Sequence, residues 1–225
     1  MNNFLRLKNI SKNFNNEKKI KVLKNLSYDF NTGKMYALMG PSGSGKSTLL
    51  NLISLVDKPT LGSIKFNDDT VNFTNNKKND IFRAKNIGIV YQQNNLLSDF
   101  TALENVYLAN LSISNNKDRA ITKAKDLLRK IGLQNRLNHF PSQLSGGECQ
   151  RVAIARAIIN DPDIILADEP TGSLDLNTAK EIFQLLNNQK KPNRLIIFAT
   201  HNRFFANKAD CLLEMINGSV KTINA

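Results

Sequence analysis

The sequence predicts an α/β fold in which a parallel β-sheet forms the core. Four short apolar runs support this prediction, because near-continuous apolar stretches of this length are typical of strands covered on both faces. The runs are Lys34–Gly40, Asn86–Gln92, Asp163–Glu169 and Arg194–Thr200. Each run ends in polar or glycine residues, and open α/β sheets bind their ligands beyond the carboxyl ends of their strands.

Length and composition favour a single cytosolic domain. The chain has 225 residues, of which 41% are hydrophobic, and this is enough for a sizeable core. No apolar run approaches the roughly 18–20 residues that span a bilayer, and the N-terminus lacks the apolar core of a signal peptide. The two cysteines lie far apart in the chain, so we expect neither a disulfide framework nor a zinc site.

The net charge of +12 raises the question of an anionic partner. The chain contains 32 Asn and 22 Lys, spread along its whole length and accompanied by no nucleic-acid-binding motif. This spread favours a compositional bias. A contribution to binding at a membrane surface is the first alternative, and nucleic acid is the second.

Two further regions lie outside the predicted parallel core. Residues 1–30 and the segment Ser63–Phe73 alternate between apolar and polar residues, which predicts a smaller antiparallel sheet. The stretch Phe73–Asp80 is polar and rich in Asn and Lys, which predicts a surface turn.

Helical spacing extends from Phe100 to Ile131. The pattern Thr101-x-x-Glu104 predicts a capping box at the start of this helical region. A second pattern of the same kind, Thr178-x-x-Glu181, predicts the start of a later helix. The sequence therefore predicts an α/β core with a helical insertion.

A glycine-rich loop, GPSGSGKST, matches G-x-x-x-x-G-K-[ST] between a predicted strand and a predicted helix. Glycines let successive backbone N–H groups turn inward around phosphate oxygens, and the helix N-terminus adds a partial positive charge. We expect Lys46 to contact the β- and γ-phosphates of a nucleotide and the Ser47 hydroxyl to bind Mg²⁺. The residues predicted to surround the phosphates are Gly40, Pro41, Ser42, Gly43, Ser44, Gly45, Lys46, Ser47 and Thr48.

Polar side chains follow the other predicted strands. In IILADEP, Asp168 is predicted to hold the Mg²⁺ shell and Glu169 to be the general base that activates water. Gln92 is predicted to contact Mg²⁺ or the attacking water. His201 is predicted to hydrogen-bond the γ-phosphate or to hold Glu169. For Gln92 and His201, the alternative is a polar residue at the sheet edge without a chemical role.

A second glycine loop lies in QLSGGECQRVAIARAI. The pattern Ser145-x-x-Glu148 predicts a capping box, but it gives no reason for Gly146 and Gly147, since alanine would suit a first turn better by up to about 1 kcal/mol per site. Bare N–H groups at a helix N-terminus suit an anion. Because the first loop already surrounds the phosphates, we expect a second copy of the chain to supply this loop to the γ-phosphate in a symmetric dimer.

In this order the motifs resemble those of the ATP-binding-cassette (ABC) ATPases over nearly the whole chain. LSGGE is similar to the signature loop of that family, GSLD to its D-loop, VYQQ to its Q-loop and ATHN to its switch histidine. The resemblance implies one P-loop NTPase domain, 1–225, with a RecA-like core. Residues 1–92 and 152–225 would form this core and an antiparallel β subdomain, and residues from about 93 to 151 a helical signature subdomain.

The resemblance also implies ATP hydrolysis, with Mg²⁺, at a dimer interface. Ser145 and Gly147 would contact the γ-phosphate held by the other subunit, with Gly146 and Asp175 also at the nucleotide. Phe14 would stack on adenine, where many family members have Tyr.

A narrower resemblance concerns the cargo. The run YQQNNLLSDFTALENV is most similar to lipoprotein-releasing ATPases, which are related to macrolide-export and cell-division cassettes. It implies a homodimer bound to integral membrane subunits at the cytoplasmic face of the bacterial inner membrane. The alternatives are a macrolide- or peptide-export or cell-division cassette, and a soluble cassette that acts on nucleic acid.

Overall fold

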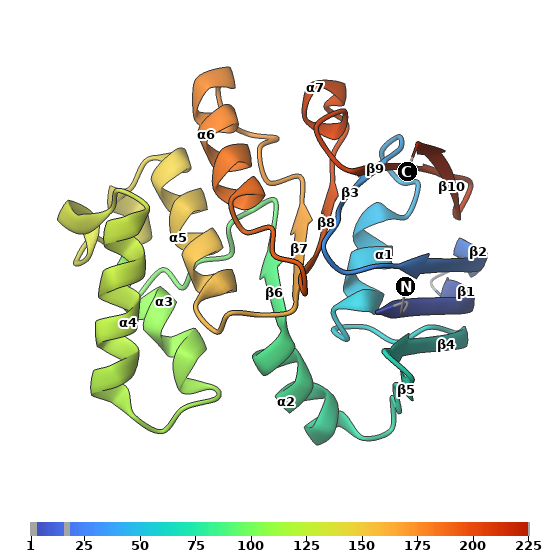
Figure 1. The fold of residues 1–225 in the computed structure, drawn as a ribbon, viewed down its shortest axis with the longest axis horizontal. Helices are drawn as coiled ribbons and strands as arrows, with labels where there is room; N and C mark the ends of the chain where they lie inside the picture. The colour runs from blue at the N-terminus through green and yellow to red at the C-terminus, as the bar shows by residue number, and fades with distance from the viewer. Residues whose placement is uncertain (1–3, 16–18, 225) are drawn as a thin grey trace. The chain divides into compact units, whose positions relative to one another are not determined.

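A computed structural model describes residues 4–15 and 19–224 (Figure 1). The chain consists of two compact units, Met1–Asp80 with Lys190–Ala225 and Ile81–Gln189. Within the described ranges, no helix is both long enough and apolar enough to cross a membrane.

The first unit contains two groups of strands. One is an antiparallel sheet with the order β2-β1-β4-β5. In the other, β3 lies between β8 and β9 and runs parallel to both, and β10 is antiparallel to β9. The strands and helices of this unit are β1 (Leu5–Asn15), β2 (Lys19–Phe30), β3 (Met35–Met39), α1 (Lys46–Ile53), β4 (Leu61–Phe66), β5 (Asp69–Thr70), β8 (Leu195–Ala199), α7 (Arg203–Ala206), β9 (Cys211–Ile216) and β10 (Ser219–Asn224).

The second unit is mainly helical and contains one parallel strand pair, β6 with β7. Its elements are β6 (Ile87–Val90), α3 (Ala102–Leu111), α4 (Lys117–Lys130), the 3-10 turns η1 (Gln134–Arg136) and η2 (Pro141–Gln143), α5 (Gly146–Ile158), β7 (Ile164–Asp168) and α6 (Leu176–Asn187). All four predicted core strands are confirmed as β3, β6, β7 and β8, and the predicted antiparallel sheet is confirmed in β1, β2 and β4.

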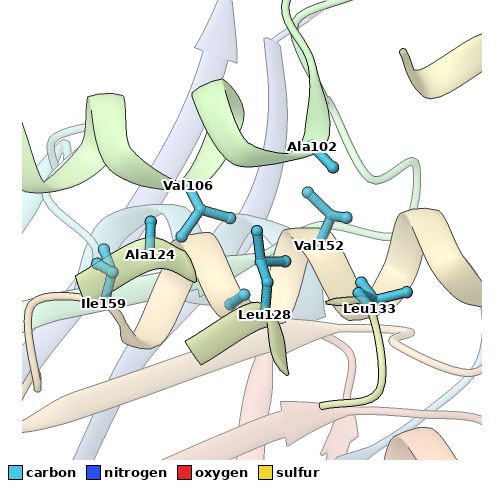
Figure 2. Close-up of a cluster of buried hydrophobic side chains, with 8 residues drawn as sticks. Ala102, Val106, Ala124, Leu128, Leu133, Val152 and Ile159 are labelled. Atoms are coloured by element: carbon cyan, nitrogen blue, oxygen red, sulfur yellow. The ribbon is translucent and has the colours of Figure 1, made fainter. Parts of the chain in front are cut away.

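The helices α3, α4 and α5 lie side by side in Figure 1 and enclose an apolar core (Figure 2). The helical spacing of their sequences supplies the apolar face of each helix. The buried members of this core are Ala102, Val106, Ala124, Leu128, Leu133, Val152, Ala155 and Ile159. This packing holds the middle and end of α5, the helix that begins with the second glycine loop.

Two local predictions are wrong. The predicted turn at Phe73–Asp80 gives way at Asn76 to helix α2 (Asn76–Asn86), which buries none of its residues. The helix α6 begins earlier than the pattern Thr178-x-x-Glu181 predicted. Its N-cap is Asp175, which accepts hydrogen bonds from the main-chain N–H groups of Asn177 and Thr178. A carboxylate that accepts two N–H groups caps this helix without the threonine.

Candidate functional site

The first glycine loop is built to leave main-chain N–H groups open. Gly40, Gly43 and Gly45 have φ angles of 150°, 76° and 103°. Gly45 is the N-cap of α1 and offers no side-chain cap, so the first N–H groups of this helix have no side-chain acceptor there. A β-carbon at Gly45 would also come within 2.9 Å of Leu23. The loop therefore has the form that binds phosphate at a helix N-terminus.

Lys46 lies within this loop. Its side chain is buried, and its ammonium group donates hydrogen bonds to the carbonyl oxygens of Gly40 at 2.8 Å and Pro41 at 3.0 Å. The buried Ser44 hydroxyl has no hydrogen-bond partner within the part of the chain that the structure describes. A charged donor and a polar hydroxyl inside one loop fit the phosphate groups of a nucleotide.

The remaining loop residues divide by exposure. Pro41, Ser42, Gly43 and Ser47 are exposed, and Thr48 is half-buried in the first turn of α1. The exposed Ser47 hydroxyl is accessible to a metal ion. With Asp168 and Gln92 the predicted metal ligands are all oxygen donors, the type that Mg²⁺ prefers. Among the described residues, no group of three or more His, Cys, Asp or Glu side chains could hold a metal ion.

His201 follows β8 and lies beside the start of the first loop. A cavity of about 390 Å³ is lined by His201, Gly40 and Pro41, together with residues of α7, β9 and β10. The next residue, Asn202, caps α7 through its side-chain oxygen, which accepts from the N–H of Phe204. The structure thus brings the predicted switch histidine and the first loop to one cavity wall.

Phe14, the predicted adenine-stacking residue, lies on β1 and is 39% exposed. The Lys12 ammonium lies 5.0 Å from the centre of its ring. Lys12 itself is held by the Asp57 carboxylate at 2.6 Å and by the Lys58 carbonyl at 2.9 Å. Sequence reasoning missed this support, because Lys12 and Asp57 are distant in the chain.

The acidic strand end lies in the second unit. Asp168 is the last residue of β7, and Glu169 follows it with a φ angle of 45°. A left-handed conformation at a residue other than glycine costs on the order of 1–3 kcal/mol and is concentrated at functional sites. The N–H of Gly172 donates to the Glu169 carbonyl at 3.1 Å and closes the turn that leads to α6. Glu169 therefore occupies a tight turn at the strand end, and its role as a base stays a prediction.

Gln92 and Asp175 also lie in this unit. Gln92 is exposed, two residues after the end of β6. Asp175 caps α6, and hydrogen bonds from the side chain and main chain of Thr178 lower the pKa of its carboxyl. Asp175 is thus ionised at neutral pH and has a structural task as a helix cap, whatever its place at the nucleotide.

The second glycine loop differs from the first, because its helix has a side-chain cap. The Ser145 hydroxyl accepts from the N–H of Glu148 at 3.2 Å, and Glu148 accepts from the N–H of Ser145 at 2.8 Å. Arg136 donates to the other oxygen of Glu148 at 2.8 Å. This bond, followed by the one from Ser145, lowers the pKa of Glu148. The predicted capping box is confirmed.

The two glycines of this loop differ in whether the packing leaves space for a β-carbon. A β-carbon at Gly147 would lie 2.5 Å from the Thr178 methyl group, so the packing of α5 against α6 requires glycine there. At Gly146 a β-carbon would lie 3.6 Å from Leu174, an ordinary contact, and the residue is exposed. The argument that neither glycine has a reason within the chain is therefore wrong for Gly147. It holds for Gly146.

The sequence matches the family model described as ABC transporter over residues 23–172. The chain belongs to the ABC transporter family. It is an ATP-binding cassette, an ATPase in which ATP hydrolysis is coupled to transport, as the resemblance of its motifs predicted.

The similarity to known relatives covers nearly the full length of the cassette. The lipoprotein-releasing system ATP-binding protein LolD of Rickettsia bellii is 44% identical over 221 residues, which cover 97% of this chain and 98% of that protein. LolD of Cytophaga hutchinsonii is 42% identical over 202 residues, covering 89% and 92%. Among solved structures, the dimeric post-hydrolysis state of the ATP-binding cassette MJ0796 bound to ADP and Pi has a TM-score of 0.90 and 36% identity, covering 98% and 99%. The predicted fold class is confirmed.

Proposed function

We propose that this cassette is the ATP-hydrolysing subunit of a transporter that releases lipoproteins from the bacterial inner membrane. The observation that carries the proposal is the 44% identity to a lipoprotein-releasing ATP-binding protein over 97% of the chain. The run YQQNNLLSDFTALENV supports the same cargo. Integral membrane subunits would bind the cassette at the cytoplasmic face, and a solved relative, cbiO1 of Clostridium perfringens, is part of the transporter complex cbiONQ.

The first loop binds the ATP phosphates in this proposal. Lys46 supplies a charged donor, and the residues Gly40–Thr48 supply N–H groups. Ser47, Gln92 and Asp168 would hold Mg²⁺, which when bound neutralises charge on the phosphate oxygens. Phe14 stacks on the adenine ring. The positive φ angles of Gly40, Gly43 and Gly45 support the phosphate assignment. The oxygen donors of Ser47, Gln92 and Asp168 support the Mg²⁺ assignment.

Glu169 takes a proton from the attacking water, and His201 donates a hydrogen bond to the γ-phosphate. Because Glu169 lies at the end of β7, its carboxylate would orient the attacking water as well as activate it. The remaining contacts come from a second copy of the cassette, whose Ser145, Gly146 and Gly147 face the γ-phosphate and whose Asp175 lies near the nucleotide. The dimeric relative supports this arrangement.

The proposed domain organisation follows the same family. One cassette domain, 1–225, would contain the core with its antiparallel β subdomain in 1–92 and 152–225. The helical subdomain would span about 93–151. The three packed helices α3, α4 and α5 support a helical part in this region.

Co-purification of the tagged cassette with its membrane partners, followed by reconstitution in proteoliposomes, tests this function. ATP should release an acylated lipoprotein into the soluble fraction, and the Glu169→Gln cassette in the same partners should release none. Export of a macrolide by the reconstituted complex would contradict the cargo. Salt-sensitive DNA binding without a membrane partner would contradict the proposed role in lipoprotein transport.

A further inference from the structure

The segment between β6 and α3 contains no helix or strand, yet side chains of two helices hold its main chain. Arg156, near the end of α5, donates from its two terminal nitrogens to the carbonyl oxygens of Asn94 and Asn95, each at 2.7 Å. These carbonyls lie two and three residues after Gln92. A planar guanidinium that donates two hydrogen bonds fixes both the distance and the orientation of the group it binds.

The surroundings of Arg156 are unusual for a cation. Burial lowers the pKa of its guanidinium, and the nearby Tyr91 acts in the opposite direction. Within the described ranges, no Asp or Glu lies within ion-pair distance of Arg156. The half-buried guanidinium therefore has the two main-chain carbonyls of Asn94 and Asn95 as its hydrogen-bond acceptors.

A second side chain anchors the other end of the segment. Asn105 of α3 is 1% exposed. Its amide oxygen accepts from the N–H of Leu97 at 2.8 Å, and its amide nitrogen lies 3.1, 2.9 and 3.0 Å from the carbonyls of Leu97, Phe100 and Thr101. Residues 94–101 are thus held at both ends, and Gln92 lies two residues before the first Arg156 contact.

The strand that leads to Gln92 is also fixed to α5. A β-carbon at Gly88 would lie 2.2 Å from the Ala157 carbonyl, so the main chains of β6 and α5 are in close approach. Contacts to the end of α5 therefore flank Gln92 on both sides, through Gly88 before it and Arg156 after it. The same helix begins with the second glycine loop, whose first residues are Gly146 and Gly147.

We infer that Arg156 is a positioning residue for Gln92, and that it joins this amide to the helix that carries the second glycine loop. The inference rests on the proposed role of Gln92 at the metal and the attacking water. When α5 moves, Arg156 carries the main chain at Asn94 and Asn95 with it, and Gln92 follows. The engagement of the second loop with a partner's nucleotide and the placement of Gln92 then become one event.

The test uses the purified full chain and a double-mutant cycle. Arg156→Lys keeps the charge but loses the paired donors. It is measured alone and together with Gln92→Ala. Arg151→Lys is the matched control, because Arg151 lies on the same helix but donates to the Glu181 carboxylate at 2.5 Å. The readouts are kcat, the KM for ATP, the Mg²⁺ concentration at half-maximal rate, and hydrogen exchange of the amides in 93–101.

We expect Arg156→Lys to lower kcat about 10-fold, the scale of groups that hold a metal ligand in place, and to leave the KM for ATP within about 2-fold. The half-saturating Mg²⁺ concentration should rise, and exchange in 93–101 should accelerate while exchange in α4 stays unchanged. Arg151→Lys should change none of these. In the Gln92→Ala background, Arg156→Lys should lower kcat no further. Arg156→Met, which removes the charge as well as the paired donors, should have a larger effect than Arg156→Lys.

Three results would overturn the inference. One is a wild-type kcat and Mg²⁺ dependence in Arg156→Lys. The second is a loss that adds fully to that of Gln92→Ala, which would show that Arg156 acts elsewhere. The third is a wild-type rate for Gln92→Ala itself, which would remove the proposed role of Gln92 along with the inference. The first two leave the proposed function standing, so the two failures can be told apart.

Discussion

The two glycine loops of the cassette are built in opposite ways. The first, Gly40–Thr48, has left-handed glycines and a helix without a side-chain cap, so the N–H groups of the first helical turn have no side-chain acceptor there and suit an anion. The second begins a helix that Ser145 and Glu148 cap on both sides, with Arg136 as a further support. One of its glycines is fixed by packing against Thr178, and the other is exposed.

This difference indicates which loop holds the nucleotide within its own chain. A loop with open N–H groups and a buried lysine can surround phosphate by itself. A capped helix start with one exposed glycine lets a ligand approach the main chain closely. This suits contact with a nucleotide that another chain already holds. Variants of one loop at a time, or of the predicted base, separate the two roles.

The largest effect should come from Glu169→Gln, which removes the general base but touches neither loop. We expect hydrolysis to fall by about 10²–10⁴-fold, while ATP affinity stays at the wild-type level. A dimer of this variant should then accumulate in the presence of ATP, and size-exclusion chromatography with light scattering would detect it. Near wild-type turnover would show that Glu169 is not the base.

Lys46→Ala should separate the first loop from the second. Losing a charged hydrogen-bond donor costs about 1.5–3 kcal/mol, so ATP affinity should fall about 10- to 100-fold. Fluorescent-nucleotide titration measures this. Lys208→Ala is a matched control, since this lysine contacts the exposed Phe204 ring. Unchanged affinity in Lys46→Ala would remove the proposed role of this residue.

Alanine at each glycine of the second loop should give contrasting results. Gly147→Ala forces a β-carbon against the Thr178 methyl group, and overpacking of this kind costs about 1–3 kcal/mol of unfolding free energy. Thr178→Ser in the same chain should restore most of it, because it removes that methyl group. Gly146→Ala should leave stability unchanged or raise it by up to about 1 kcal/mol, because alanine suits a first helical turn better than glycine. Urea unfolding measures all three, and equal destabilisation by the two alanines would contradict the packing argument.

The smallest effect concerns the pH dependence of the capping box. The folded-state pKa of Glu148 is lowered, so its ionised form stabilises the fold above the unfolded pKa. That contribution is lost as the pH falls through the folded value. Relative to Glu148→Gln, wild type should be more stable by up to about 1 kcal/mol at pH 7, with the difference shrinking below pH 4.5. A difference that grows on acidification would reverse this account.

The sequence was sufficient for the loops and strands because their signals are local. The spacing of Gly40, Gly45 and Lys46, and the apolar run before Asp168, are each contained in a few residues. The capping box at Ser145 was predictable for the same reason. By contrast, α2 buries none of its residues, so no apolar periodicity marks it, and its polar start resembles a turn.

The features that sequence reasoning missed depend on residues distant in the chain. Gly147 meets Thr178 only because α5 packs on α6, and Arg156 meets Asn94 only after the segment following β6 returns to α5. An arginine among the apolar residues of a predicted helix was the available signal for the second contact. The start of α6 was misplaced because Asp175 competes with Thr178 as a cap.

Mixing two inactive variants tests most directly whether the second loop serves a nucleotide held by another chain. Lys46→Ala disables the first loop. Gly146→Asp places its β-carbon in ordinary contact with Leu174 and suits a helix start, but its carboxylate repels a phosphate. At an ATP concentration that saturates wild type but not Lys46→Ala, each variant alone should be nearly inactive, and an equal mixture should recover about a quarter of wild-type ATPase activity, because half of the dimers have one intact composite site. A mixture as inactive as its parts, although mixed dimers form, would contradict the account.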